Sequence, residues 1–137
     1  MCFANDIPLI SVSSLEILAN SSNFNGIIIP TIDARRDEVY SSAYFQSNMI
    51  SKEKPENIVS ESFIEYLKNN NIIIVGNGQF KCEKIIKKHK KIFFDKNIIN
   101  PSSKYMPELS YRKFFNNEFE DLAYFEPTYL KEFKTNL

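Results

Sequence analysis

The sequence predicts an α/β fold built on a mixed sheet, in which a three-stranded antiparallel meander is followed by βαβ crossovers. Two β-rich apolar runs, Ile27–Ile32 and Val39–Phe45, flank a short charged segment, as in an antiparallel hairpin. A buried-type run, Ile72–Val75, ends at a glycine-containing turn. Amphipathic segments separate the later strands, and parallel neighbours require such crossovers. Together these patterns indicate antiparallel strands first and parallel strands afterwards.

The first third of the chain predicts one helix before the hairpin and one strand after it. A strand-like run, Ile7–Val12, opens the chain, and Ser13-x-x-Glu16 then has the spacing of a capping box. We expect a helix from there to about Asn20. After the hairpin, Met49–Glu53 is expected to form the third strand before Lys54–Asn57 interrupts it.

The later part alternates helix and strand signals. A second capping box, Ser62-x-x-Glu65, predicts a helix that stops at a run of asparagines. We expect a further helix at about Gln79–His89, a strand at Lys91–Asp95 and a last helix with Pro107 in its first turn. The remaining stretch, Leu122–Phe133, is rich in tyrosine and phenylalanine, and a partner or the core could cover it.

Composition limits the function classes. The length of 137 residues fits one domain, 1–137, and the 17 basic and 17 acidic side chains cancel, which excludes a global attraction to nucleic acid or an anionic membrane. The two cysteines and the one histidine give no zinc-site spacing, and we expect reduced thiols. With no basic leader and no apolar run near the ~20 residues of a membrane span, the protein is expected to be cytoplasmic, without a membrane partner.

The charged hairpin segment offers the first candidate recognition residues: Asp33, Arg35, Arg36, Asp37 and Glu38. Charges in such a turn commonly just solvate it, because each exposed ion pair contributes only about 0 to 1 kcal/mol. The two arginines nevertheless present planar forks that suit a carboxylate or phosphate. A structural or surface-recognition role is favoured over catalysis.

Gly76, Asn77 and Gly78 form a weaker candidate, a nucleotide-binding turn. They follow a strand and precede a helix, where backbone N–H groups can meet a phosphate. The complete glycine-rich phosphate-binding patterns are absent, so a tight strand-to-helix turn is the favoured interpretation.

A basic run provides the third set of candidates, for RNA contact: Lys84, Lys87, Lys88 and Lys91. Lysines near a helix end also complement its dipole and need no ligand, and no aromatic residues interleave with them. His89 lies in this run without an acidic or cysteine partner at ligand spacing. No GxSxG segment accompanies it, so serine hydrolysis gains no support, and no catalytic or metal-ligating residue is assigned.

Four segments in order resemble the TsaB family, also called YeaZ, a subunit of the bacterial machinery that makes threonylcarbamoyladenosine in tRNA. IDARRDEVY is the most specific part of the resemblance; the four segments are IPLISVSSLEILA (7–19), IPTIDARRDEVYSSAYF (29–45), IIIVGNGQ (72–79) and PTYLKEF (127–133). The resemblance implies an actin-like (ASKHA) half-domain, the C-terminal half of that family. The family's N-terminal half is expected to be absent from these residues.

The resemblance also implies a function. Such a chain would be a non-catalytic accessory subunit that supports a TsaD-like transferase together with a TsaE-like ATPase and meets tRNA indirectly. ATP and metal would be bound by the partner subunits, with no cofactor on this chain, and self-association stays open. Two alternatives remain: a nucleotide-dependent transferase or hydrolase of the actin-like superfamily, with Asp33 and the Gly76–Gly78 turn facing one cleft, and an RNA-binding module that uses the Lys81–Lys91 patch.

Overall fold

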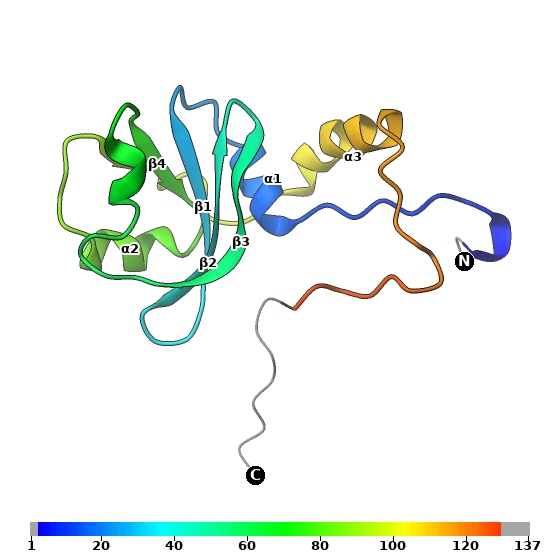
Figure 1. The fold of residues 1–137 in the computed structure, drawn as a ribbon, viewed down its shortest axis with the longest axis horizontal. Coiled ribbons are helices and arrows are strands. Elements are labelled where there is room, and N and C mark those ends of the chain that lie inside the picture. Colours follow the sequence, from blue (N-terminus) through cyan, green and yellow to red (C-terminus); the bar gives the residue numbers. More distant parts are fainter. Residues whose placement is uncertain (1–2, 130–137) are drawn as a thin grey trace, which may run out of the picture.

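The computed structural model describes residues 3–129 and shows a mixed five-stranded sheet with helices (Figure 1). The helices and strands are α1 (Ser14–Asn20), β1 (Ile27–Asp33), β2 (Glu38–Phe45), β3 (Asn48–Asn57), β4 (Ile72–Val75), α2 (Gln79–Ile85), β5 (Ile92–Phe94) and α3 (Met106–Phe115). Short 3-10 turns occur at Phe3–Asn5, Ile64–Leu67 and Ser103–Tyr105. None of the helices in this described part is long and apolar enough to cross a membrane.

The strand order β3-β2-β1-β4-β5 confirms the predicted fold class. β1 pairs antiparallel with β2, and β2 with β3, which is the expected meander. β4 lies parallel to both β1 and β5, and α2 provides the crossover between the two parallel strands. Because parallel strands end at the same edge of a sheet, the segments that follow β1, β4 and β5 lie close together.

Each face of the sheet is covered by one helix. β1 and β4 are apolar on both faces, which suits central strands buried on both sides. One cluster joins the strands to Cys82 and Ile86 at α2, and the other joins them to Leu15, Leu18 and Ala19 of α1. A hydrophobic core therefore lies on each face of the sheet.

The N-terminal segment and α3 lie together beside the sheet (Figure 1). Lys113 Nζ on α3 donates to the Ser11 carbonyl at 2.9 Å, and the Glu120 N–H donates to the Leu9 carbonyl at 2.9 Å. Leu109 is the one residue of α3 that is buried. This arm of the molecule is thus held mainly by polar contacts.

Two sequence-based predictions about regular structure are wrong. The segment 7–12 is not a strand, because its backbone bonds to α3 and to the segment after it rather than to the sheet. No α-helix begins at Ser62: the Ser62 hydroxyl accepts the Val59 N–H, and Phe63 adopts a left-handed backbone (φ +66°). A single 3-10 turn, Ile64–Leu67, therefore takes the place of the expected helix.

Two further boundaries differ from the prediction. The second helix ends at Ile85 instead of His89, because Ile86 becomes extended and buried and the Lys87 N–H donates to the Ser60 carbonyl. β3 continues through Lys54–Asn57, since an edge strand tolerates Pro55 without a donor. The expected helix with Pro107 in its first turn is confirmed. Part of the predicted aromatic tail, 130–133, lies outside the described residues, as does Cys2.

Gly76 should be essential for the junction of β1 and β4. Its φ is +91°, and a Cβ there would lie 2.0 Å from the Thr31 carbonyl oxygen. Because neither the Thr31 nor the Gly76 backbone can move away within a buried sheet, Gly76→Ala is expected to lower the unfolding free energy by at least ~3 kcal/mol. Urea denaturation measures it, with the exposed loop substitution Asn69→Ala as a control expected to cost under ~1 kcal/mol. Equal costs for the two variants would contradict this assignment.

Candidate functional site

The structure brings two predicted groups together at the carboxyl ends of β1 and β4. The Asn77 Oδ1 accepts the Asp33 N–H at 2.7 Å, so the glycine turn is bonded directly to the start of the charged loop. Thr31 ties the strands just before this point, because its hydroxyl donates to the Val75 carbonyl at 2.7 Å. Asp33 and the turn are therefore adjacent, but none of the described cavities is lined by Asp33 or by Gly76–Gly78.

Lys81 on α2 connects the same two loops, and the sequence analysis did not single it out. Its Nζ lies 2.6 Å from the Asp33 carboxylate and donates to the carbonyls of Ala34 at 2.7 Å and Glu38 at 2.8 Å. All three N–H bonds of an ammonium group are thereby directed at protein acceptors. Lys81 fixes the charged loop on α2. In the sequence, its position in the basic run Lys81–Lys91 was the only signal, and that signal pointed to RNA contact instead.

The N–H groups of the glycine turn are also engaged within the protein. The Gly76 N–H donates to the Ile98 carbonyl at 2.8 Å, and the Gly78 N–H donates to the Thr31 carbonyl at 3.3 Å. Buried Gln79, a second residue that the sequence analysis missed, binds the carbonyls of Gly76, Asp95 and Ile98 through its Nε2. This side chain closes the turn against the segment after β5. The turn therefore has the features of a structural junction, and its role with a nucleotide stays a prediction.

The charged loop itself is exposed and tightly closed. Its ends are bonded through the Ala34 N–H and the Glu38 carbonyl at 3.1 Å, and Arg36 adopts a left-handed backbone with φ +54°. The side chains of Arg35, Arg36 and Asp37 are exposed. Their exposure leaves these side chains accessible to a partner, and their recognition role stays a prediction.

The predicted RNA-contact lysines separate into two groups. Lys91 Nζ donates to the Leu67 carbonyl at 3.2 Å and thus holds the 3-10 turn before β4. Lys84, Lys87 and Lys88 are exposed, the last two in the loop that follows the early end of α2. The structure thus gives Lys91 a role in the fold and leaves the other three side chains at the surface.

The nucleophile and metal candidates are poorly placed for chemistry. Cys82 is fully buried against the sheet, and burial raises the pKa of its thiol to about 12, so it is not a thiolate at neutral pH. His89 is exposed, and its Nδ1 accepts the Lys91 N–H at 3.1 Å. Within residues 3–129, no three His, Cys, Asp or Glu side chains are grouped to hold a metal ion.

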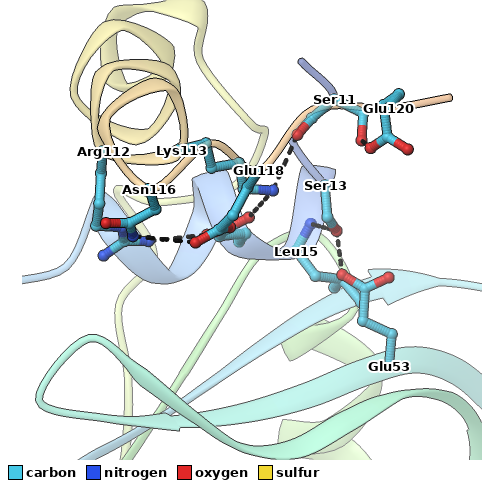
Figure 2. Close-up of polar contacts among 10 residues, drawn as sticks. Ser11, Ser13, Leu15, Glu53, Arg112, Lys113, Asn116, Glu118 and Glu120 are labelled. Carbon is cyan, nitrogen blue, oxygen red and sulfur yellow. Dashed lines mark hydrogen bonds and ion pairs between the residues drawn. The ribbon is translucent and has the colours of Figure 1, made fainter. Parts of the chain in front are cut away.

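A second polar cluster, which the sequence did not predict, joins α1 to α3 and to the sheet (Figure 2). Ser13 caps α1 by accepting the Leu15 N–H, and its hydroxyl donates to the Glu53 carboxylate on β3. Glu16, expected to complete the capping box, instead lies 2.9 Å from Arg112 and 3.3 Å from Lys113. The carboxylate thus holds α3 instead of the start of its own helix.

Beside this cluster lies the largest of the described cavities, of about 620 Å³. Its walls come from residues 11–15, the end of β1, the start of β2, β3, α3 and the segment after α3, with Tyr40, Glu53 and Lys113 among its lining residues. None of the sequence-based site residues contributes to its wall. The cavity is thus separate from the loop junction at Asp33.

Comparisons with known proteins place the chain in a family. A family model described as "TsaD: tRNA N6-adenosine threonylcarbamoyltransferase" matches residues 1–134. The tRNA threonylcarbamoyladenosine biosynthesis protein TsaB of Bacillus subtilis (strain 168) is 29% identical over 138 residues, covering 96% of this chain and 59% of the relative. The chain belongs to this threonylcarbamoyladenosine family, in its TsaB (YeaZ) branch.

Two solved structures share the fold of this chain. YeaZ from Pseudomonas aeruginosa has a TM-score of 0.74 at 23% identity, covering 94% of this chain and 62% of that one. An uncharacterized protein with similarity to peptidase YeaZ, from the same organism, has a TM-score of 0.74 at 22% identity, with 95% and 62% covered. The chain spans about three fifths of the length of these TsaB and YeaZ relatives.

Lys81 is expected to matter more to this TsaB-family fold than its partner Asp33. Lys81→Met leaves the Ala34 carbonyl without its ammonium donor, and the Glu38 carbonyl loses this donor but keeps the Ala34 N–H, so the unfolding free energy should fall by about 1 to 3 kcal/mol. Asp33→Asn removes only a half-exposed ion pair and should cost under ~1 kcal/mol. Urea denaturation of both variants tests the difference, and a larger loss for Asp33→Asn would refute it.

Glu16 should control how firmly α3 stays on the body of the protein. Glu16→Gln keeps the shape of the side chain but removes both ion pairs, so α3 amides are expected to exchange hydrogen about fivefold faster, in line with a ~1 kcal/mol loss. Exchange of the β1 and β4 amides should not change. Glu108→Gln, on exposed surface of the same helix, is the matched control. Unchanged α3 exchange in the Glu16 variant would contradict the assignment.

Proposed function

We propose that this chain takes part in the threonylcarbamoyladenosine modification of tRNA as an accessory subunit that does not itself carry out the transfer. The observation that carries the proposal is the family match over residues 1–134, together with the likeness to a TsaB biosynthesis protein over nearly the whole chain. In this proposal a TsaD-like transferase and a TsaE-like ATPase are its partners. The adenosine next to the anticodon is the site of modification, and the cytoplasm is the location.

The geometry supports an accessory role because the polar groups at the loop junction are used to hold the fold. Lys81 binds three protein acceptors, and the glycine-turn donors of Gly76 and Gly78 bind backbone carbonyls. A catalytic lysine or phosphate-binding turn would need those donors for its substrate. We therefore propose that ATP and metal are bound by the partner subunits.

The exposed charged loop is the proposed recognition surface for a protein partner. Arg35, Arg36 and Asp37 are exposed, while Lys81 and the junction beneath them fix the backbone of the loop. A loop held in one conformation loses little conformational entropy when it binds. Planar arginine forks suit carboxylates of a partner protein.

Association and activity assays test the proposal directly. The purified chain is mixed with the TsaD-like and TsaE-like proteins of its own organism, and complex mass is measured by light scattering. A second form carries, in addition, the part of a TsaB relative that this chain does not span. We expect at least one form to associate and to raise the yield of threonylcarbamoyladenosine, measured by mass spectrometry of tRNA nucleosides.

A matched pair of variants examines the recognition surface. Arg35→Glu should weaken association at least tenfold if the loop meets an acidic partner surface. Lys52→Glu makes the same charge change on exposed β3 and should have little effect. If neither form associates and the tRNA yield does not change, the accessory role is refuted.

A further inference from the structure

The early end of α2 creates a cationic groove. Because the helix stops at Ile85, residues 87–90 form an exposed loop between α2 and β5. A groove of about 380 Å³ lies here, lined by Lys87, Lys88, His89 and Lys90 on the loop side and by Ile92 and Phe94 on β5. Since the chain leaves the helix before these lysines, the loop places Lys87, Lys88 and Lys90 along one groove.

The lysines of this groove have no role in holding the fold. Lys81, Lys91 and Lys113 each donate to backbone carbonyls. In contrast, the exposed ammonium groups of Lys84, Lys87, Lys88 and Lys90 have no hydrogen-bond or ion-pair partner within residues 3–129.

The positive charge of the groove is not cancelled locally. Glu83 borders the groove, and its carboxylate is already paired with Lys96 at 3.0 Å. In a chain of zero net charge, this gathering of cations is a local feature.

Ring surfaces accompany the charges. Phe94 is half-buried and packs against the core cluster under α2, which holds its ring in place beside the groove. The exposed His89 ring is oriented by its Nδ1, which accepts the Lys91 N–H. Cations combined with flat rings are typical of sites for single-stranded RNA, in which phosphates meet lysines and bases stack. An acidic protein surface would use the charges but not the rings.

We propose that this groove, lined by the loop 87–90 and Phe94, binds the sugar-phosphate backbone and an unstacked base of RNA together with the exposed Lys84, which follows the lining residue Glu83, and that tRNA is the ligand. The identity of the RNA rests on the proposed function in tRNA modification. The groove adds a direct contact with the tRNA to an accessory role that otherwise needs only protein partners. It would help to hold the tRNA in the assembly without taking part in the chemistry.

The electrostatic part of this binding has an expected size. Four lysines on four phosphates give a slope of about −2.8 to −3.6 in log affinity against log salt concentration. Raising the salt from about 50 to 200 mM should then weaken binding on the order of 50- to 150-fold. Each lysine that is removed should reduce the slope by about 0.7 to 0.9.

Fluorescence anisotropy with unmodified tRNA at several salt concentrations tests the groove. The variant Lys87→Gln/Lys88→Gln/Lys90→Gln should bind at least tenfold more weakly and lose about two to three units of the salt slope. Lys52→Gln/Lys54→Gln/Lys104→Gln carries the same charge change on surfaces away from the groove and should change affinity less than twofold. No tRNA binding by the unaltered chain, or equal losses in the two triple variants, would overturn the proposal.

Polyglutamate serves as a probe for a simple charge effect. If it competes with tRNA as well as a single-stranded RNA of equal charge does, the groove is a general anion surface and the RNA assignment is wrong. Phe94→Leu should weaken RNA binding severalfold while leaving polyglutamate binding unchanged, and its melting temperature shows whether the fold persists. Because these assays use the chain alone, they stay independent of the accessory role: tRNA binding through the groove would still be shown if the association and yield assays refuted that role.

Discussion

The close contact between Thr31 on β1 and Gly76 after β4 is the constraint on which the rest of the structure depends. A Cβ at Gly76 would lie 2.0 Å from the Thr31 carbonyl oxygen, so only glycine allows these two segments of the chain to come so close. The Thr31 hydroxyl donates to the Val75 carbonyl, and the Thr31 carbonyl accepts the Gly78 N–H. This contact sets the register of the parallel pair at the edge where the charged loop and the glycine turn emerge.

The loop junction and the α1–α3 cluster use charged residues for the same purpose. Lys81 holds the charged loop to α2, and Glu16 holds α3 to α1 through Arg112 and Lys113. In both places a long side chain bridges segments far apart in sequence, where an apolar core does not reach. Lys81 and Glu16 thus hold the fold together at these two places.

The cationic groove differs from these clusters because its lysines contribute nothing visible to the fold. Lys87, Lys88 and Lys90 are exposed on a loop whose backbone is fixed by the Lys87 N–H to the Ser60 carbonyl. A cation that is not needed for stability keeps its binding capacity for a ligand. Within the basic run, Lys81 and Lys91 bond carbonyls of the fold, so only the remaining lysines are available to a ligand.

The sequence by itself determined the class of the sheet, an antiparallel meander followed by parallel strands. The apolar runs of β1 and β4, the hairpin between Ile32 and Val39, and Pro107 at the start of α3 are local signals that do not depend on distant residues. Tertiary structure decided where helices end and what polar side chains do. The end of α2 depends on the bond between the Lys87 N–H and the Ser60 carbonyl. The helix predicted at Ser62 does not form, because its hydroxyl bonds the Val59 N–H and Phe63 is left-handed. Glu16 pairs with Arg112 on a distant helix. Residue spacing cannot reveal such partners. A capping or basic pattern shows which donors and acceptors are available, but the folded chain decides which of them bond.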